Sequence, residues 1–146
     1  MGRPTNSSPS SHAAPDLPPK RTGLLRALFA LKHSYDGLHM TFRSESAFRQ
    51  ETALAVVLVP CALLLPVTPI ERVMLIGTVL LVLLVELLNS AVEAVVDRIS
   101  LDHHELSGRA KDCGSAAVLI ALIICAMTWA TVLWPVAKQW LHPHGG

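Results

Sequence analysis

The sequence predicts an all-α membrane protein with one amphipathic surface helix followed by three transmembrane helices. The chain of 146 residues is 51% hydrophobic and only 16% charged. Its apolar residues gather into three long runs, each close to the roughly 20 residues that a helix needs to cross a bilayer. The segment before these runs carries apolar residues at helical spacing, which is typical of a helix lying in a membrane surface.

The chain begins with a segment that we expect to be disordered. Residues 1–22 are rich in proline and serine and contain few apolar side chains to bury. From Leu24 to Phe42 apolar side chains recur every three or four residues, which predicts a surface helix over 24–43. A helix packed on a soluble core would show the same pattern, but the apolar runs that follow favour a membrane surface.

The three expected spans complete a membrane domain. The surface helix and the spans make up residues 23–137, and a short tail follows at 138–146. The expected spans cover about 48–66, 70–99 and 110–136. Each is long enough to cross the hydrocarbon layer, the first being at the short end for a span.

Two of the spans contain residues that predict a local feature, a proline kink in one and an aromatic belt near the end of the other. Pro60 in the first span would kink the helix unless neighbours bond the carbonyl that it frees. Trp129 and Trp134 lie toward the far end of the third span and Trp140 lies just beyond it, which predicts an aromatic belt at the membrane surface.

The positive charges predict the orientation. Of the 12 Lys and Arg residues, only Arg72 lies in the first loop and only Lys138 in the C-terminal tail. The others precede residue 50 or lie around the second loop. Because cytoplasmic segments carry the excess of Lys and Arg, we expect the N-terminus and the second loop to be cytoplasmic.

The second span contains an acidic stripe, defined as Glu86, Ser90, Glu93 and Asp97. At 100° per residue the other three side chains fall within about 40° of Glu86, with Asn89 at the edge. Glu86 lies near the membrane boundary, where an isolated carboxylate is costly and usually serves a function. The alternative is a helix that leaves the membrane and becomes amphipathic. That alternative does not explain why the polar groups share one line.

Carboxylates with Lys and Arg nearby suit a site for Mg²⁺ and a polyphosphate. The sequence has no GxxxxGK[ST] and no GxGxxG motif, so any nucleotide site must be built from helices. His103 and His104 suggest zinc, but no third ligand stands at a recognisable spacing. A net charge of +1 argues neither for nor against a nucleic-acid partner, but no basic patch is interleaved with aromatic residues, so we expect none. The residues alone predict a cation-dependent site at a cytoplasmic membrane surface.

Three motifs resemble one known family. They are SESAFRQE at 44–51, VELLNSAVEAVVDRI at 85–99 and HELSGRAKDCGSAAVLIAL at 104–122. The resemblance, from about Arg26 to Trp134, is to the bacterial integral-membrane diacylglycerol kinases of the prokaryotic diacylglycerol kinase and undecaprenol kinase family. It implies a homotrimer in the bacterial inner membrane. The implied reaction transfers the γ-phosphate of MgATP to the hydroxyl of 1,2-diacylglycerol and gives phosphatidic acid and ADP.

The resemblance also implies roles for single residues. Glu86 matches the family's general base, and Glu45 and Glu93 match carboxylates that hold Mg²⁺ against the ATP phosphates. The other positions that match nucleotide-binding residues are Arg26, His33, Asp102, His103, His104, Lys111 and Asp112. The positions that match the lipid site are Arg26, Phe48, Gln50, Glu51, Arg72, Glu86, Ser115 and Trp129. Asn89 and Asp97 match supporting polar residues, whereas His33, Tyr35, His39 and Cys113 depart from the residues usual in the family.

Two alternatives remain open. Undecaprenol kinase shares the fold and the carboxylates, but the HELSGRAKD segment looks more like the diacylglycerol enzyme. A non-catalytic membrane interaction protein or an ion carrier would also use buried carboxylates. A carrier, however, has no need of Glu45, Lys111 and Asp112 beside the acidic stripe.

Overall fold

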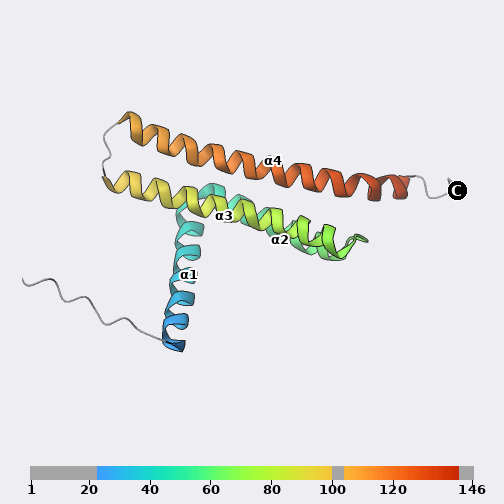
Figure 1. Cartoon of the computed structure of the whole chain (residues 1–146), viewed down its shortest axis with the longest axis horizontal. Helices are drawn as coiled ribbons and strands as arrows, with labels where there is room; N and C mark the ends of the chain where they lie inside the picture. Colours follow the sequence, from blue (N-terminus) through green and yellow to red (C-terminus); the bar gives the residue numbers. More distant parts are fainter. Residues whose placement is uncertain (1–22, 100–103, 142–146) are drawn as a thin grey trace, which may run out of the picture.

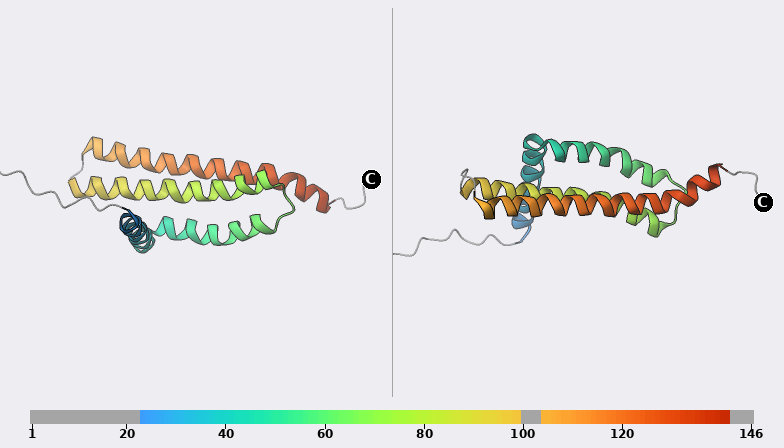
Figure 2. Two further views of the ribbon diagram at one scale, coloured as in Figure 1. Left: turned by 60° about the horizontal axis from the view of Figure 1, so that its bottom comes forward. Right: turned by 90° about the horizontal axis from the view of Figure 1, so that it is seen from above.

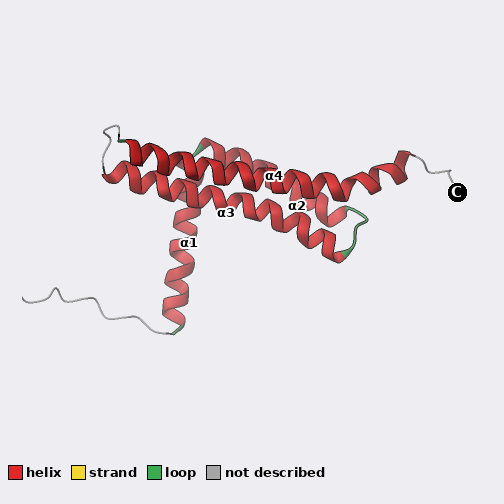
Figure 3. Cartoon of the chain, turned by 45° about the horizontal axis from the view of Figure 1, so that its top comes forward, coloured by secondary structure: helices red, strands yellow, loops and turns green. Residues whose placement is uncertain are grey.

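The computed structural model describes residues 23–99 and 104–141, and in these ranges the chain is almost entirely helical (Figure 3). The helices are α1 (Leu24–Ser44), α2 (Ser46–Leu64), α3 (Pro69–Ile99) and α4 (Glu105–Leu141) (Figure 1). The last three are long and apolar enough to cross a membrane. The all-α prediction with three such helices is therefore confirmed. The expected tail at 1–22 and the end at 142–146 lie outside the described residues.

The helix α1 leaves the bundle of α2, α3 and α4 at a steep angle (Figure 2). Glu45 makes this corner, because its backbone is extended (φ −100°, ψ 121°) while its N–H still bonds to the Thr41 carbonyl at 2.8 Å. The Arg49 guanidinium donates to the carbonyl of Arg43 at 3.2 Å, which caps the end of α1. Phe48, only 3% exposed, anchors the first turn of α2. The corner therefore holds Glu45 at the junction of α1 and the bundle.

The turn between α2 and α3 is fixed by a capping box. The Glu71 carboxylate accepts hydrogen bonds from the Thr68 backbone N–H and hydroxyl, both at 2.8 Å. The Glu71 N–H bonds back to the Thr68 hydroxyl at 3.3 Å. Pro69 stands at the first helical position, where its missing N–H costs nothing. The helix α3 thus begins at a defined residue.

Arg72 closes the end of α2. Its Nε donates to the Ala62 carbonyl and its Nη2 to the Leu65 carbonyl, each at 3.1 Å. Four residues after Ala62 the chain has Pro66, which lacks the N–H that would normally bond the Ala62 carbonyl. Arg72 therefore satisfies a backbone acceptor that the sequence leaves open. Pro60, in contrast, lies inside α2 without ending the helix.

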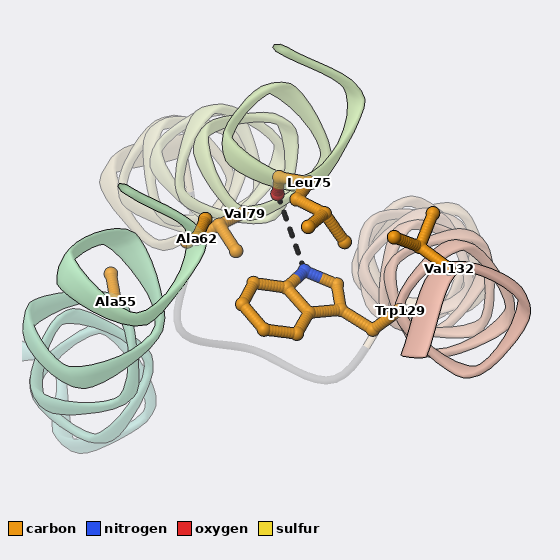
Figure 4. Close-up of a cluster of buried hydrophobic side chains, with 6 residues drawn as sticks. All are labelled: Ala55, Ala62, Leu75, Val79, Trp129 and Val132. Atoms are coloured by element: carbon orange, nitrogen blue, oxygen red, sulfur yellow. Dashed lines mark hydrogen bonds between the residues drawn. The ribbon is translucent and has the colours of Figure 1, made fainter. Parts of the chain in front are cut away.

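The bundle has one cluster of buried apolar side chains, which we call the core cluster (Figure 4). Its members are Ala55 and Ala62 of α2, Leu75 and Val79 of α3, and Trp129 and Val132 of α4. The alanines allow α2 to approach α3 closely, as small residues do in membrane bundles. Trp129 fills the space between the helices, and its indole Nε1 donates to the Leu75 carbonyl at 3.2 Å.

The prediction that Trp129 belongs to an exposed aromatic belt is wrong. Trp129 is only 9% exposed, because its N–H finds an acceptor on α3 while its rings fill the core. Trp134 is 66% exposed, as expected of a belt residue, and the Lys138 ammonium lies 5.0 Å from its ring centroid. The side chain of Trp140 lies outside the described residues.

Candidate active site

Glu86 is a buried residue of α3. With 4% of its surface exposed, it is the one buried polar side chain in the described part of the chain. It follows the buried apolar residues Val79 and Val82 on the same face of α3. The charges of Glu93 further along α3 and of Glu45 at the corner after α1 act on it, and Glu86 in turn acts on Glu51 of α2. The fold thus gathers four carboxylates from distant parts of the sequence.

Asn89 orients one of these carboxylates. Its Nδ2 donates a hydrogen bond to Glu93 Oε1 at 3.1 Å, one helical turn along α3. A carboxylate can only accept hydrogen bonds, so the amide nitrogen must be the end that faces Glu93. This contact fixes the direction of the Glu93 carboxylate and leaves its second oxygen available to another partner.

Several polar atoms beside Glu86 are buried without a hydrogen-bond partner among the described residues. They are Glu51 Oε2, Thr52 Oγ1, Asn89 Oδ1 and Ser90 Oγ. Buried polar atoms are nearly always paired with protein, water, an ion or a ligand, because leaving them unpaired costs about 1–3 kcal/mol each. Their concentration around Glu86 is typical of a site that binds a ligand.

The donor set fits a magnesium ion that arrives with phosphate. No group of three or more His, Cys, Asp or Glu within residues 23–99 and 104–141 is arranged to hold a metal by itself. Magnesium, however, commonly takes only one or two carboxylates and completes its shell with phosphate oxygens and water. Glu45 and Glu93 offer such hard oxygen ligands, and the unpaired oxygens nearby support the same interpretation.

An ion pair ties α4 to the end of the acidic stripe. Lys111 Nζ lies 2.6 Å from Asp97 Oδ1, and both side chains are roughly half exposed. The charge of Glu93 also acts on Lys111. Lys111, which the motifs assign to the nucleotide, therefore lies beside the last carboxylate of the acidic stripe. Its ammonium group is already directed to Asp97.

An apolar pocket lies beside Glu51. It is a small, partly open hollow between α2, α3 and α4, with Val82, Leu122 and Cys125 in its wall. Glu51 also lines this pocket and provides its charged group. The site therefore has a charged part around Glu86 and Glu93 and an apolar part that runs toward the core cluster.

The other predicted nucleotide residues do not all meet this cluster. Arg26 and His33 lie on exposed parts of α1, and Asp112 is exposed on α4. The ring of His104 accepts a hydrogen bond from the Leu106 N–H at 3.2 Å, so it caps the start of α4. Asp102 and His103 lie outside the described residues.

The predicted lipid residues do not all lie together. Glu51 lies beside Glu86, while Gln50 and Ser115 are exposed on α2 and α4. Arg72 and Trp129 lie far from Glu86. Arg72 precedes Glu86 on α3 by nearly four turns, about 21 Å, and Trp129 bonds to Leu75, about three turns away.

Sequence reasoning missed the contacts between helices. Nothing in the motifs predicted the pairing of Lys111 with Asp97, and Gly114 was not singled out. For the buried face of α4 a signal exists, because Ala121, Cys125 and Trp129 recur every four residues, as on one side of a helix. That spacing predicts which side of α4 faces the core.

The fold and the site define a class of protein: a three-span helical membrane protein with carboxylates gathered around the buried Glu86. A profile of the family described as Prokaryotic diacylglycerol kinase matches residues 32–133. The chain belongs to the prokaryotic diacylglycerol kinase family, as its three motifs predicted.

Curated relatives agree with this assignment. The chain is 53% identical over 113 residues to the diacylglycerol kinase of Escherichia coli (strain K12). The aligned residues cover 77% of this chain and 93% of that protein. It is 52% identical over 114 residues to the diacylglycerol kinase of Haemophilus influenzae, with 78% and 97% covered. The enzyme of Pseudomonas aeruginosa is 54% identical over 113 residues, with 77% and 92% covered.

Proposed function

We propose that the chain is an ATP-dependent diacylglycerol kinase. It transfers the γ-phosphate of ATP to the free hydroxyl of a 1,2-diacylglycerol and releases phosphatidic acid and ADP. The family and its curated relatives, named diacylglycerol kinases, support this activity. The single observation on which the site assignment depends is the burial of Glu86 among Glu45, Glu51 and Glu93.

Glu86 is the proposed general base. A lipid hydroxyl lies near the membrane boundary, and Glu86 stands between the apolar pocket on one side and the polar residues Asn89 and Glu93 on the other. Its carboxylate takes the hydroxyl proton as the oxygen forms its bond to the γ-phosphorus and the bond from that phosphorus to ADP breaks. The apolar pocket beside Glu51 is suited to the first part of an acyl chain.

Glu45 and Glu93 are the proposed ligands of Mg²⁺. When bound, the ion neutralises part of the phosphate charge. Lys111 contributes a positive charge at the same end of the bundle, where Asp97 directs it. The motif resemblance also assigns Arg26, His33, Asp102, His103, His104 and Asp112 to the nucleotide.

We propose a homotrimer in the bacterial inner membrane, with the N-terminus and the second loop in the cytoplasm. The excess of Lys and Arg on these segments supports the orientation. Beside the acidic stripe, Leu88, Val92 and Val95 are exposed in the single chain. Neighbouring subunits would shield this end of α3 from lipid, which a three-span subunit alone does poorly.

The test is ATP turnover by the purified protein in detergent, with diacylglycerol and undecaprenol compared as acceptors. We expect ADP release and phosphatidic acid formation with diacylglycerol, and much slower turnover with undecaprenol. Faster turnover with undecaprenol would assign the chain to the related polyprenol kinases. No ADP release with either lipid would favour a non-catalytic protein or an ion carrier.

A further inference from the structure

Gly114 of α4 faces Asn89 of α3 at very short range. A Cβ built on Gly114 would overlap the Asn89 side-chain oxygen and lie 3.2 Å from its Cγ. At the other glycines in the described ranges, Gly23, Gly37, Gly77 and Gly108, a Cβ would meet nothing within 4 Å. The close approach is therefore specific to Gly114.

The overlap concerns the end of the Asn89 side chain and spares its backbone. The same Cβ would lie 3.8 Å from the Asn89 Cα, which is an ordinary van der Waals distance. Alanine is also a better helix former than glycine. A methyl group at position 114 therefore leaves the two helices in place and forces the Asn89 amide to turn away.

The position of α4 leaves little freedom to avoid this contact. On one side of Gly114, Lys111 is paired with Asp97 at 2.6 Å. On the other side, the Trp129 indole is bonded to the Leu75 carbonyl at 3.2 Å. Because both contacts join α4 to α3, sliding α4 along α3 would break at least one of them.

The amide that would turn is the one that orients Glu93. Its Nδ2 donates to Glu93 Oε1 at 3.1 Å, while its Oδ1, buried against Gly114, has no hydrogen-bond partner among the described residues. No bond holds the oxygen end, so the shape of the contact with Gly114 helps to fix the amide. We propose that Gly114 is a positioning residue, whose missing side chain allows Asn89 to hold the Glu93 carboxylate in its working direction.

This inference rests on the proposed role of Glu93 at the magnesium and phosphate site. Residues that orient a metal ligand typically change metal affinity by about 10- to 100-fold when they are altered. A misdirected Glu93 carboxylate should therefore raise the Mg²⁺ midpoint and the KM for MgATP more than the KM for diacylglycerol.

The experiment compares Gly114→Ala with Gly108→Ala, a substitution on the same helix where a Cβ meets nothing. The midpoint of Mg²⁺ activation and the KM values for MgATP and diacylglycerol are measured in detergent. For Gly114→Ala we expect the Mg²⁺ midpoint to rise about 10-fold or more, with the diacylglycerol KM and the helical circular dichroism unchanged. For Gly108→Ala all values should stay within about twofold of the parent.

A double variant shows whether Gly114 acts through Asn89. In an Asn89→Ala background no amide remains to be displaced, so adding Gly114→Ala should change the Mg²⁺ midpoint by less than about twofold. An equal penalty in both backgrounds would overturn the proposal, because the methyl would then act on packing. Parental kinetics of Gly114→Ala, or its failure to fold, would overturn it as well.

Glu93→Gln separates this proposal from the proposed function. If Glu93→Gln keeps the parental Mg²⁺ dependence, Glu93 is not a metal ligand and the proposed site is wrong. If Glu93→Gln alters that dependence while Gly114→Ala does not, the site stands and the positioning role of Gly114 is refuted.

Discussion

Replacing Trp129 by Phe separates two accounts of this residue. The structure packs Trp129 in the core cluster, whereas motif resemblance assigns it to the lipid site. Phe loses the N–H that bonds to the Leu75 carbonyl, a type of contact worth about 0.6–1.7 kcal/mol between membrane helices. The smaller ring also forfeits van der Waals contacts. The Leu75 carbonyl keeps its bond from the Thr78 hydroxyl at 3.1 Å, so it is not left unpaired. We therefore expect the unfolding free energy to fall by about 1–3 kcal/mol.

The assay is unfolding in mixed detergent micelles, followed by circular dichroism, together with the KM for diacylglycerol. Trp134→Phe is the matched control, because Trp134 is largely exposed and should change stability by no more than about 0.5 kcal/mol. The KM of Trp129→Phe for diacylglycerol should equal that of the parent. A raised KM with unchanged stability would refute the burial argument and return Trp129 to the lipid site.

Three further predictions concern the ends of the bundle. Arg72→Met removes two charge-assisted hydrogen bonds at the end of α2 and should lower stability by about 1.5–3 kcal/mol. A raised KM for diacylglycerol without that loss would instead support a lipid-binding Arg72. Lys111→Met should raise the KM for MgATP more than Asp97→Asn does, while both cost at most about 1 kcal/mol of stability because the pair is half exposed. Equal kinetic effects would mean that Lys111 acts only through its ion pair. Glu45→Gln and Glu93→Gln should each raise the Mg²⁺ concentration needed for half-maximal turnover, and unchanged metal titrations in both would remove them as ligands.

The helices and the acidic stripe could be predicted because they depend on local spacing. Apolar residues every three or four positions define α1, and long apolar runs define α2, α3 and α4. Glu86 and Glu93 share a face because residues seven apart on one helix always do. The expectation that Glu86 is functional came from its place near the membrane boundary, whereas its role as general base came from the family resemblance.

Contacts between helices could not be predicted, because they depend on how two distant segments align. The sequence does not show that Asn89 meets Gly114 or that Lys111 pairs with Asp97. For the same reason the sequence alone predicts a belt position for Trp129. A tryptophan near the end of a span suits either the membrane surface or the core, and the rotation of α4 decides which.

The most direct test of the account is the rate at which Glu86→Gln forms phosphatidic acid at saturating MgATP and diacylglycerol. Gln keeps the shape of Glu but cannot take the hydroxyl proton, so turnover should fall by roughly two to four orders of magnitude. The fold and MgATP binding should be retained. Glu71→Gln is the control on the same helix, because an amide oxygen still accepts the Thr68 hydrogen bonds. The account predicts a parental rate for Glu71→Gln, and a near-parental rate for Glu86→Gln would contradict it.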